Sequence, residues 1–173
     1  AEKCKDKIGG KWEAFANFWR TTQLEYTWLR SLMERHKDFW LVTEDSLDKS
    51  MKAFDIDLSM KEELLNLYKV LSPYKEVPET LKTLKEKNFK LAILSNGTPS
   101  LLNELVKSNN LENLFDDIFS IEEVGVYKPS SKVYDIPIKK YHIEKSEVAF
   151  LSANTWDVSG GGNYGYQSIW INR

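Results

Sequence analysis

The sequence has only one cysteine, Cys4, among its 173 residues. A single cysteine excludes a framework of internal disulfides and favours a reducing compartment. The chain also lacks an uninterrupted apolar run of the roughly 18 residues that a membrane span requires, and no signal-peptide pattern opens it. We therefore expect a cytoplasmic protein without a membrane partner.

Neither positive nor negative charge is in large excess. The 24 basic and 26 acidic residues give a net charge of -2, which provides no field to attract nucleic-acid phosphates. His36 and His142 have no companion ligands at the spacing of a metal site, and the glycines at 160–162 lack a nucleotide-binding frame. We expect no nucleic-acid partner, no bound metal and no cofactor.

The 173 residues are enough for one substantial core, or for a core with a small lid. A hydrophobic content of 42%, with 13% aromatic residues, is typical of a packed globular protein. The first half shows helical periodicity only, in segments at 12–32, 47–54 and 59–68. The last of these opens with a capping box formed by Ser59 and Glu62. We predict a helical domain over residues 1–71.

Short strands alternate with helices from residue 72 onward. Apolar runs at 89–94, 118–119, 148–151 and near 169 predict strands, and helices are expected between them. This order predicts a doubly wound, Rossmann-like parallel sheet with helices on both faces, over residues 72–173. Two features oppose the pattern: Pro137 costs a helix interior about 3 kcal/mol, and three successive glycines weaken a helix start by up to about 1 kcal/mol each.

Polar residues follow two of the predicted strands. Ligands of such sheets bind at the carboxyl ends of the strands, so Ser95-Asn96 and the segment 152–157 are expected at the same rim. Lys128, held by the following proline, can neutralise a carboxylate there, and Asp157 can hold a water and take its proton. Taken singly, each of these residues fits a turn, a helix cap or an exposed surface position equally well.

Four stretches in order closely resemble the L-2-haloacid dehalogenases of the haloacid dehalogenase superfamily. They are "WRTTQLEYTWLRSLM" (19–33), "LSNGTP" (94–99), "YKPSSKVY" (127–134) and "SANTWDVSG" (152–160). The resemblance covers almost the whole chain, and it implies a doubly wound α/β core with an inserted helical-bundle cap domain. It also implies hydrolysis of L-2-haloacids to D-2-hydroxy acids, with inversion, through an aspartyl-ester intermediate.

The resemblance also implies roles for the residues that bind substrate and leaving group. By position, Arg20 and Asn96 receive the departing halide, and Ser95 holds the substrate carboxylate. Lys128 orients the nucleophile, with Tyr134 close by. The implied chemistry is coherent, because cationic and amide donors stabilise the charge of a leaving halide in a dry pocket.

The remaining implied roles concern water and the apolar part of the substrate. Ser152, Asn154 and Asp157 arrange and activate the hydrolytic water. The apolar wall around the carbon substituent is formed by Leu24, Phe39 and Trp156.

The family's nucleophilic aspartate belongs to a first core strand that would precede residue 1. That strand and the final elements after residue 173 are absent from this sequence, so we expect a fragment that is inactive by itself. Two alternatives stay open: a Mg-dependent phosphatase of the same superfamily, and a non-catalytic fragment. The single carboxylate of Asp157 makes a poor oxygen cage for Mg²⁺ and disfavours the phosphatase.

Members of the family often form homodimers. The aromatic-rich surface expected from Trp12, Phe15, Trp19 and Tyr26 permits such a dimer but does not require it.

Overall fold

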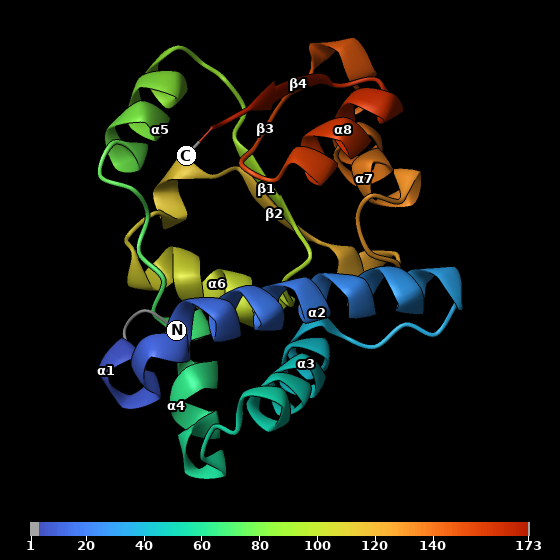
Figure 1. The fold of residues 1–173 in the computed structure, drawn as a ribbon. Coiled ribbons are helices and arrows are strands. Elements are labelled where there is room, and N and C mark those ends of the chain that lie inside the picture. The colour runs from blue at the N-terminus through green and yellow to red at the C-terminus, as the bar shows by residue number, and fades with distance from the viewer. Residues whose placement is uncertain (1–3, 173) are drawn as a thin grey trace.

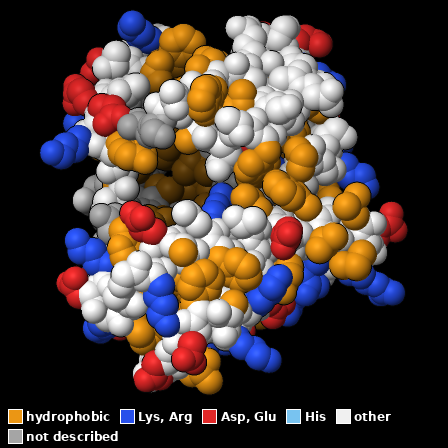
Figure 2. All heavy atoms as spheres, viewed as in Figure 1, with side chains coloured by type: hydrophobic (Ala, Val, Ile, Leu, Met, Phe, Trp, Pro, Cys, Tyr) orange, Lys and Arg blue, Asp and Glu red, His pale blue; other side chains and the backbone are white. Residues whose placement is uncertain are grey.

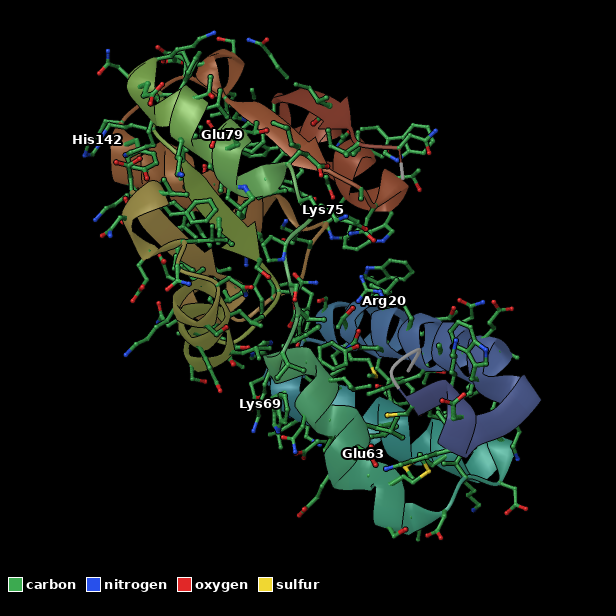
Figure 3. All side chains as sticks on the ribbon, turned by 90° about the vertical axis from the view of Figure 1, so that its left-hand side faces the viewer. Arg20, Glu63, Lys69, Lys75, Glu79 and His142 are labelled. Atoms are coloured by element: carbon green, nitrogen blue, oxygen red, sulfur yellow. The ribbon has the colours of Figure 1, made fainter. Side chains whose placement is uncertain are left out.

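The computed structural model describes residues 4–172, so residues 1–3 and 173, at the ends of the two predicted domains, lie outside the described part. Figure 3 shows two lobes joined by the connection between Lys69 and Lys75. One lobe holds the helices of the first half of the chain, and the other holds the strands with their helices. The boundary expected between residues 71 and 72 stays a prediction.

Within residues 4–71, the helical lobe has four α-helices and three short 3₁₀ turns. They are α1 Lys5–Ile8, η2 Gly9–Lys11, α2 Trp12–Leu32, α3 Phe39–Phe54, η3 Leu58–Met60, α4 Lys61–Asn66 and η4 Leu67–Lys69. The periodic segment 12–32 forms α2 as predicted. Within the described residues, no helix has the length and apolar character needed to cross a bilayer.

The capping box predicted at Ser59 is wrong. The Asp57 side chain accepts the N–H of Ser59 at 2.8 Å and opens the turn η3, and α4 begins only at Lys61. A carboxylate reaches the N–H two residues onward readily, so Asp57 accepts the Ser59 N–H that the predicted box assigned to the Glu62 side chain.

The aromatic surface expected to permit a dimer is also wrong in its main members. Phe15 and Trp19 are 0% and 4% exposed, and they lie in a core cluster with Leu47, Met51 and Leu64 of α3 and α4. The indole N–H of Trp19 donates to the carbonyl of Thr43 at 3.2 Å. Helices α3 and α4 cover this face, because the cap needs its aromatic side chains for its own core.

The α/β lobe alternates strands and helices. Its elements are α5 Val77–Glu86, β1 Ala92–Ser95, α6 Pro99–Ser108, η5 Glu112–Leu114, β2 Asp117–Ser120, η6 Ile121–Glu123, α7 Ser131–Tyr141, η7 Lys145–Glu147, β3 Ala149–Ser152, α8 Thr155–Tyr164 and β4 Gln167–Trp170. Figure 1 shows α7 and α8 together on one side of the strands and α5 on the other. This confirms the predicted Rossmann-like α/β class, and Pro137 lies inside α7.

The strands pair in two parallel ladders. Residues 92–95 of β1 pair with 117–120 of β2, and 149–152 of β3 pair with 167–170 of β4. In the described part of the chain, β1 and β3 are not paired with each other. Polar contacts and helix packing therefore join the two ladders.

The first turn of α3 is packed into the α/β lobe. Phe39 and Val42 belong to the same buried cluster as Leu101 of α6, Phe119 of β2 and Ile121 of η6. Because interiors are closely packed, this cluster fixes where the helical lobe meets the strands.

The three successive glycines lie in the second half of α8, so the predicted weak helix start is wrong. The helix begins at Thr155, and it contacts β3 and β4 closely. A Cβ on Gly161 would lie 2.7 Å from Cδ1 of Phe150 and 2.9 Å from Oγ of Ser168. A Cβ on Gly162 would meet nothing nearer than 3.8 Å. Gly161 is thus required for the approach of α8 to the strands.

We expect Gly161→Ala to lower the free energy of unfolding by about 1–3 kcal/mol, because the added methyl overpacks the contact with Phe150. Gly162→Ala is the matched control, and it should raise stability by up to about 1 kcal/mol through helix propensity. Urea unfolding of both variants measures the difference. Equal stability of the two variants would contradict the close approach.

Candidate active site

A cavity of about 1090 Å³ lies between the lobes and between the two strand pairs. Figure 2 shows it as a hollow with hydrophobic side chains in its depth. Nine of the residues singled out from the sequence line it: Arg20, Phe39, Ser95, Asn96, Lys128, Ser152, Asn154, Trp156 and Asp157. Leu24 and Tyr134 are not among the lining residues; Leu24 is half-buried, and Tyr134 is fully buried behind the rim.

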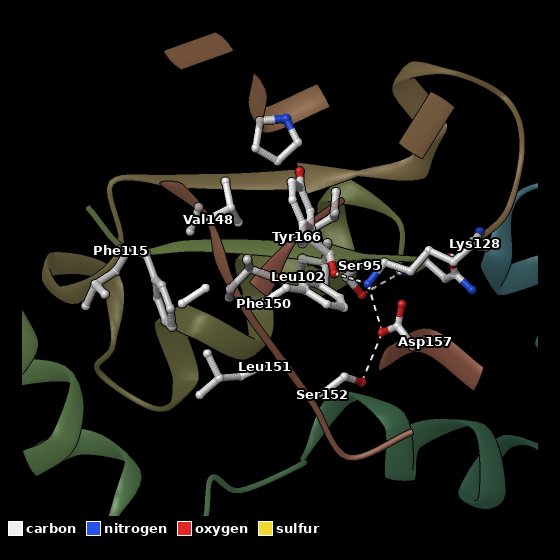
Figure 4. A pocket seen from close by; sticks show the side chains of 18 of the residues that line it. Ser95, Leu102, Phe115, Lys128, Val148, Phe150, Leu151, Ser152, Asp157 and Tyr166 are labelled. Atoms are coloured by element: carbon white, nitrogen blue, oxygen red, sulfur yellow. Dashed lines mark hydrogen bonds and ion pairs between the residues drawn. The ribbon is translucent and has the colours of Figure 1, made fainter. Parts of the chain in front are cut away.

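The two predicted polar segments lie at the carboxyl ends of the strands. Strand β1 ends at Ser95, and β3 ends at Ser152. Asn154 is the N-cap position of α8, which places Asp157 in the first turn of that helix. Figure 4 shows the side chains of Ser95, Ser152 and Asp157 converging with Lys128 at one end of the cavity. The geometric expectation of a shared rim is therefore confirmed.

Asp157 is the best-connected side chain of the rim. It is 5% exposed and accepts three hydrogen bonds: from the Tyr134 hydroxyl at 2.8 Å, from Lys128 Nζ at 3.1 Å and from the Ser152 hydroxyl at 3.0 Å (Figure 4). Tyr134 uses one carboxylate oxygen, and Lys128 and Ser152 share the other. These contacts hold the carboxylate in one orientation at the end of β3.

Lys128 is a buried ammonium, only 4% exposed. Burial lowers its pKa, and the charge of Asp157 opposes this effect. Its Nζ donates to the carbonyl of Leu94 at 2.8 Å and to Asp157, so two of its three N–H groups have partners among the described residues. Lys128 Nζ also lies 4.9 Å from the centroid of the Phe150 ring, and the residue lines the cavity.

Tyr134 is held in its protonated form. Burial raises the pKa of its hydroxyl, and the charge of Asp157 raises it further. The group therefore remains an O–H donor to Asp157 at neutral pH.

Ser95 and Asn96 present donors at the end of β1. The Ser95 oxygen accepts the N–H of Gly97 at 3.1 Å, and the Asn96 side-chain oxygen accepts the backbone N–H of Lys128 at 3.3 Å. With these oxygens engaged, the Ser95 hydroxyl proton and the Asn96 amide N–H groups can be donated to a ligand. Both residues precede α6, whose N-terminus favours negative charge.

Arg20 comes to the site from the helical lobe. Figure 3 shows it on the side of α2 that faces the α/β lobe. Its Nη1 donates to the Gln23 side-chain oxygen at 2.8 Å. The Gln23 side-chain amide in turn donates to the Thr43 hydroxyl at 2.7 Å and accepts from the Tyr68 hydroxyl at 3.4 Å. These partners are neutral, so they orient the guanidinium and leave its charge for an anion.

Gln23, Tyr68 and Trp28 are residues of this region that the sequence reasoning missed. Gln23 is three residues from Arg20, so helical neighbour spacing could have indicated it. Tyr68 carried no such signal. The Trp28 ring packs edge to face against the Trp156 ring, with 5.7 Å between the ring centroids. This contact joins the helical lobe to the rim.

The charges at the rim suit an anionic ligand. Arg20, Lys128 and Asp157 all line the cavity and together leave a net positive charge, while Lys90 and Glu147, which also line it, balance each other. Within the described residues, no group of three or more His, Cys, Asp or Glu side chains could hold a metal ion.

Known proteins share both the sequence and the fold. The family model described as haloacid dehalogenase-like hydrolase matches residues 21–171. The (S)-2-haloacid dehalogenase of Pseudomonas sp. strain YL is 38% identical over 173 residues, covering 99% of this chain and 75% of that protein. The (S)-2-haloacid dehalogenase 1 of Pseudomonas sp. strain CBS-3 is 39% identical, with 96% and 74% covered.

Among solved structures, the L-2-haloacid dehalogenase from Xanthobacter autotrophicus with chloropropionic acid covalently bound superposes with a TM-score of 0.90. It is 34% identical and covers 100% of this chain, which corresponds to 71% of its own. The chain therefore belongs to the haloacid dehalogenase-like hydrolases and, within them, to the (S)-2-haloacid dehalogenases.

Proposed function

We propose that this protein hydrolyses L-2-haloacids to D-2-hydroxy acids with inversion, through an aspartyl-ester intermediate. The observation that carries the proposal is the rim itself, where Lys128, Tyr134 and Ser152 hold the carboxylate of Asp157 in a cavity that Arg20 also lines. The similarity to proteins named (S)-2-haloacid dehalogenases supports the same substrate class.

The nucleophile would come from a strand seated between β1 and β3. These two parallel strands are unpaired with each other in the described chain, and apolar side chains from residues 91–94 and 148–151 line the space between them (Figure 4). The relatives extend further than this chain, which matches about three quarters of their length. Asp157 is the only aspartate among the described residues that line the cavity.

In the first step, the nucleophilic aspartate of the strand seated between β1 and β3, and not Asp157, would attack C2 of the substrate from the side opposite the halogen. The new C–O bond forms as the carbon–halogen bond breaks, and the electron pair leaves with the halide. Arg20 and Asn96 would stabilise the developing halide charge, while Ser95 holds the substrate carboxylate. Attack from the opposite side inverts C2.

In the second step, water attacks the carbonyl carbon of the ester. Asp157 would take the proton from this water, and the hydroxy acid leaves with a proton while the nucleophilic carboxylate is regenerated. The bond between C2 and its new oxygen stays intact, so the inverted configuration is kept. Lys128, through its remaining N–H, would orient the nucleophile in both steps.

We expect Arg20→Ala to lower the rate of halide release from L-2-chloropropionate by about 10²–10³-fold, the usual loss when one donor to a developing anion is removed. Halide is measured in EDTA, with the protein expressed from its whole open reading frame. Arg35→Ala removes an exposed arginine of the loop after α2 and serves as the matched control. An Arg20→Ala variant at full rate, or a parent that needs Mg²⁺ and turns over p-nitrophenyl phosphate instead, would refute the proposal.

We expect Asp157→Asn to separate the two steps, because an amide cannot take a proton from water. With L-2-chloropropionate, the variant should release one equivalent of chloride slowly and then accumulate the ester, which intact-protein mass spectrometry detects. Release of chloride over many turnovers without accumulated ester would contradict the role of Asp157.

We also propose a cytoplasmic homodimer. The lone Cys4 is buried, and the end of α2 exposes Leu29, Leu32 and Met33 on one face, at 49%, 81% and 58%. Light scattering should give twice the mass of one chain, and Leu32→Glu should give the mass of one chain. A parent that scatters as a single chain would exclude the dimer.

A further inference from the structure

The Glu122 side chain spans the junction between the lobes. It lies in the turn η6, directly after β2, and both of its carboxylate oxygens bind the segment that leads into α3. Oε1 accepts the backbone N–H of Phe39 at 3.2 Å, and Oε2 lies 2.7 Å from Nε2 of His36. None of the roles given above to the rim residues uses this carboxylate.

Glu122 acts as a cap for α3 from the other lobe. The first N–H groups of a helix have no partner within the helix, and negative charge is favoured beside them. Asp38 accepts the N–H of Leu41 at 3.0 Å, while Glu122 accepts the N–H of Phe39, the first residue of α3. The backbone of Phe39 is thus bound to the α/β lobe by a hydrogen bond to a charged acceptor.

The same hydrogen-bond chain continues to the rim. The Ser120 hydroxyl accepts the N–H of Glu122 at 3.2 Å and donates to the carbonyl of Gly97 at 2.6 Å. Gly97 directly follows the donors Ser95 and Asn96. An unbroken series of contacts therefore links the backbone of Phe39 to the loop that presents these donors.

The side chain of Phe39 gives this link a consequence for the cavity. Phe39 is 8% exposed, packs with the buried cluster of the α/β lobe and lines the cavity. A shift of the first turn of α3 would move this ring relative to Ser95 and Asn96. Under the proposed function Phe39 is part of the apolar wall around the substituent on C2, so the shape of that pocket would depend on this separation.

We propose that Glu122 is a positioning residue that sets the specificity for the C2 substituent, by fixing Phe39 relative to the donors at the end of β1. This inference rests on the proposed function. Glu122 touches no substrate atom; it acts through Phe39. Loss of the carboxylate weakens contact with the substituent, while a substrate without a substituent is unaffected.

The test compares L-2-chloropropionate with chloroacetate, which lacks the methyl group on C2. In Glu122→Ala, the ratio of the two kcat/KM values should fall about threefold or more, within the range that one methyl contact contributes to discrimination. The loss should appear as a higher KM for chloropropionate with kcat unchanged, because the contact with the methyl group stabilises the bound substrate and the transition state equally. The kcat/KM of chloroacetate, which lacks the methyl group, should change by less than about twofold.

Two further variants and a control define the role of the carboxylate. Glu122→Asp keeps the negative charge but shortens the side chain by one methylene, so it should also lower the ratio of the two kcat/KM values. It tests the inference even if Glu122→Ala fails to fold. Glu122→Gln retains a carbonyl oxygen for the N–H of Phe39 and should restore the ratio. Glu123→Ala removes the adjacent, exposed carboxylate and should leave both substrates unchanged.

An unchanged ratio in Glu122→Asp, with halide still released, overturns the inference and leaves the proposed function standing. An equal fall in kcat/KM for both substrates also overturns it, because that result would show that Glu122 has a structural role only. A parent protein that releases no halide from either substrate refutes the proposed function instead.

Discussion

The buried ion pair of Lys128 and Asp157 joins the two strand pairs of the α/β lobe. Removing two charges from water is costly, and their attraction offsets this cost only when further hydrogen bonds satisfy them. Here the carbonyl of Leu94 takes one N–H of Lys128, while Tyr134 and Ser152 donate to Asp157. Since β1 and β3 are unpaired in the described chain, these bonds from Leu94 to Ser152 connect the two strand pairs.

Periodicity in the sequence predicted which segments would be helix or strand, but it could not say what each face would meet. The apolar spacing of α2 was clear, yet Phe15 and Trp19 were expected at a surface and lie in the core of the cap. The glycines of α8 carried a propensity penalty in the sequence, whereas Gly161 permits the close approach of α8 to Phe150 of the preceding strand β3. Helix propensity carries no signal for packing of this kind.

The rim was more predictable than the packing, for a topological reason. Parallel strands with short connections place their carboxyl ends together, so Ser95 and Ser152 could be assigned to one edge without coordinates. The contact between the Asp157 carboxylate and the Tyr134 hydroxyl depends on how α7 lies against α8, and the sequence alone did not contain it. The resemblance to a family indicated that these residues belong together but not which atoms meet.

The donors that we propose for a leaving halide, Arg20 and Asn96, come from different lobes, so the proposed chemistry depends on the junction between the lobes. Arg20 is carried by α2 with neutral partners, so its charge is free, but its position depends on how the helical lobe is held. Asn96 is fixed to the α/β lobe through the backbone of Lys128. Electrostatic stabilisation is effective only when donors are oriented before charge develops. Burial of the first turn of α3 and the Glu122 contact with Phe39 contribute to that orientation, because they hold the helical lobe against the α/β lobe.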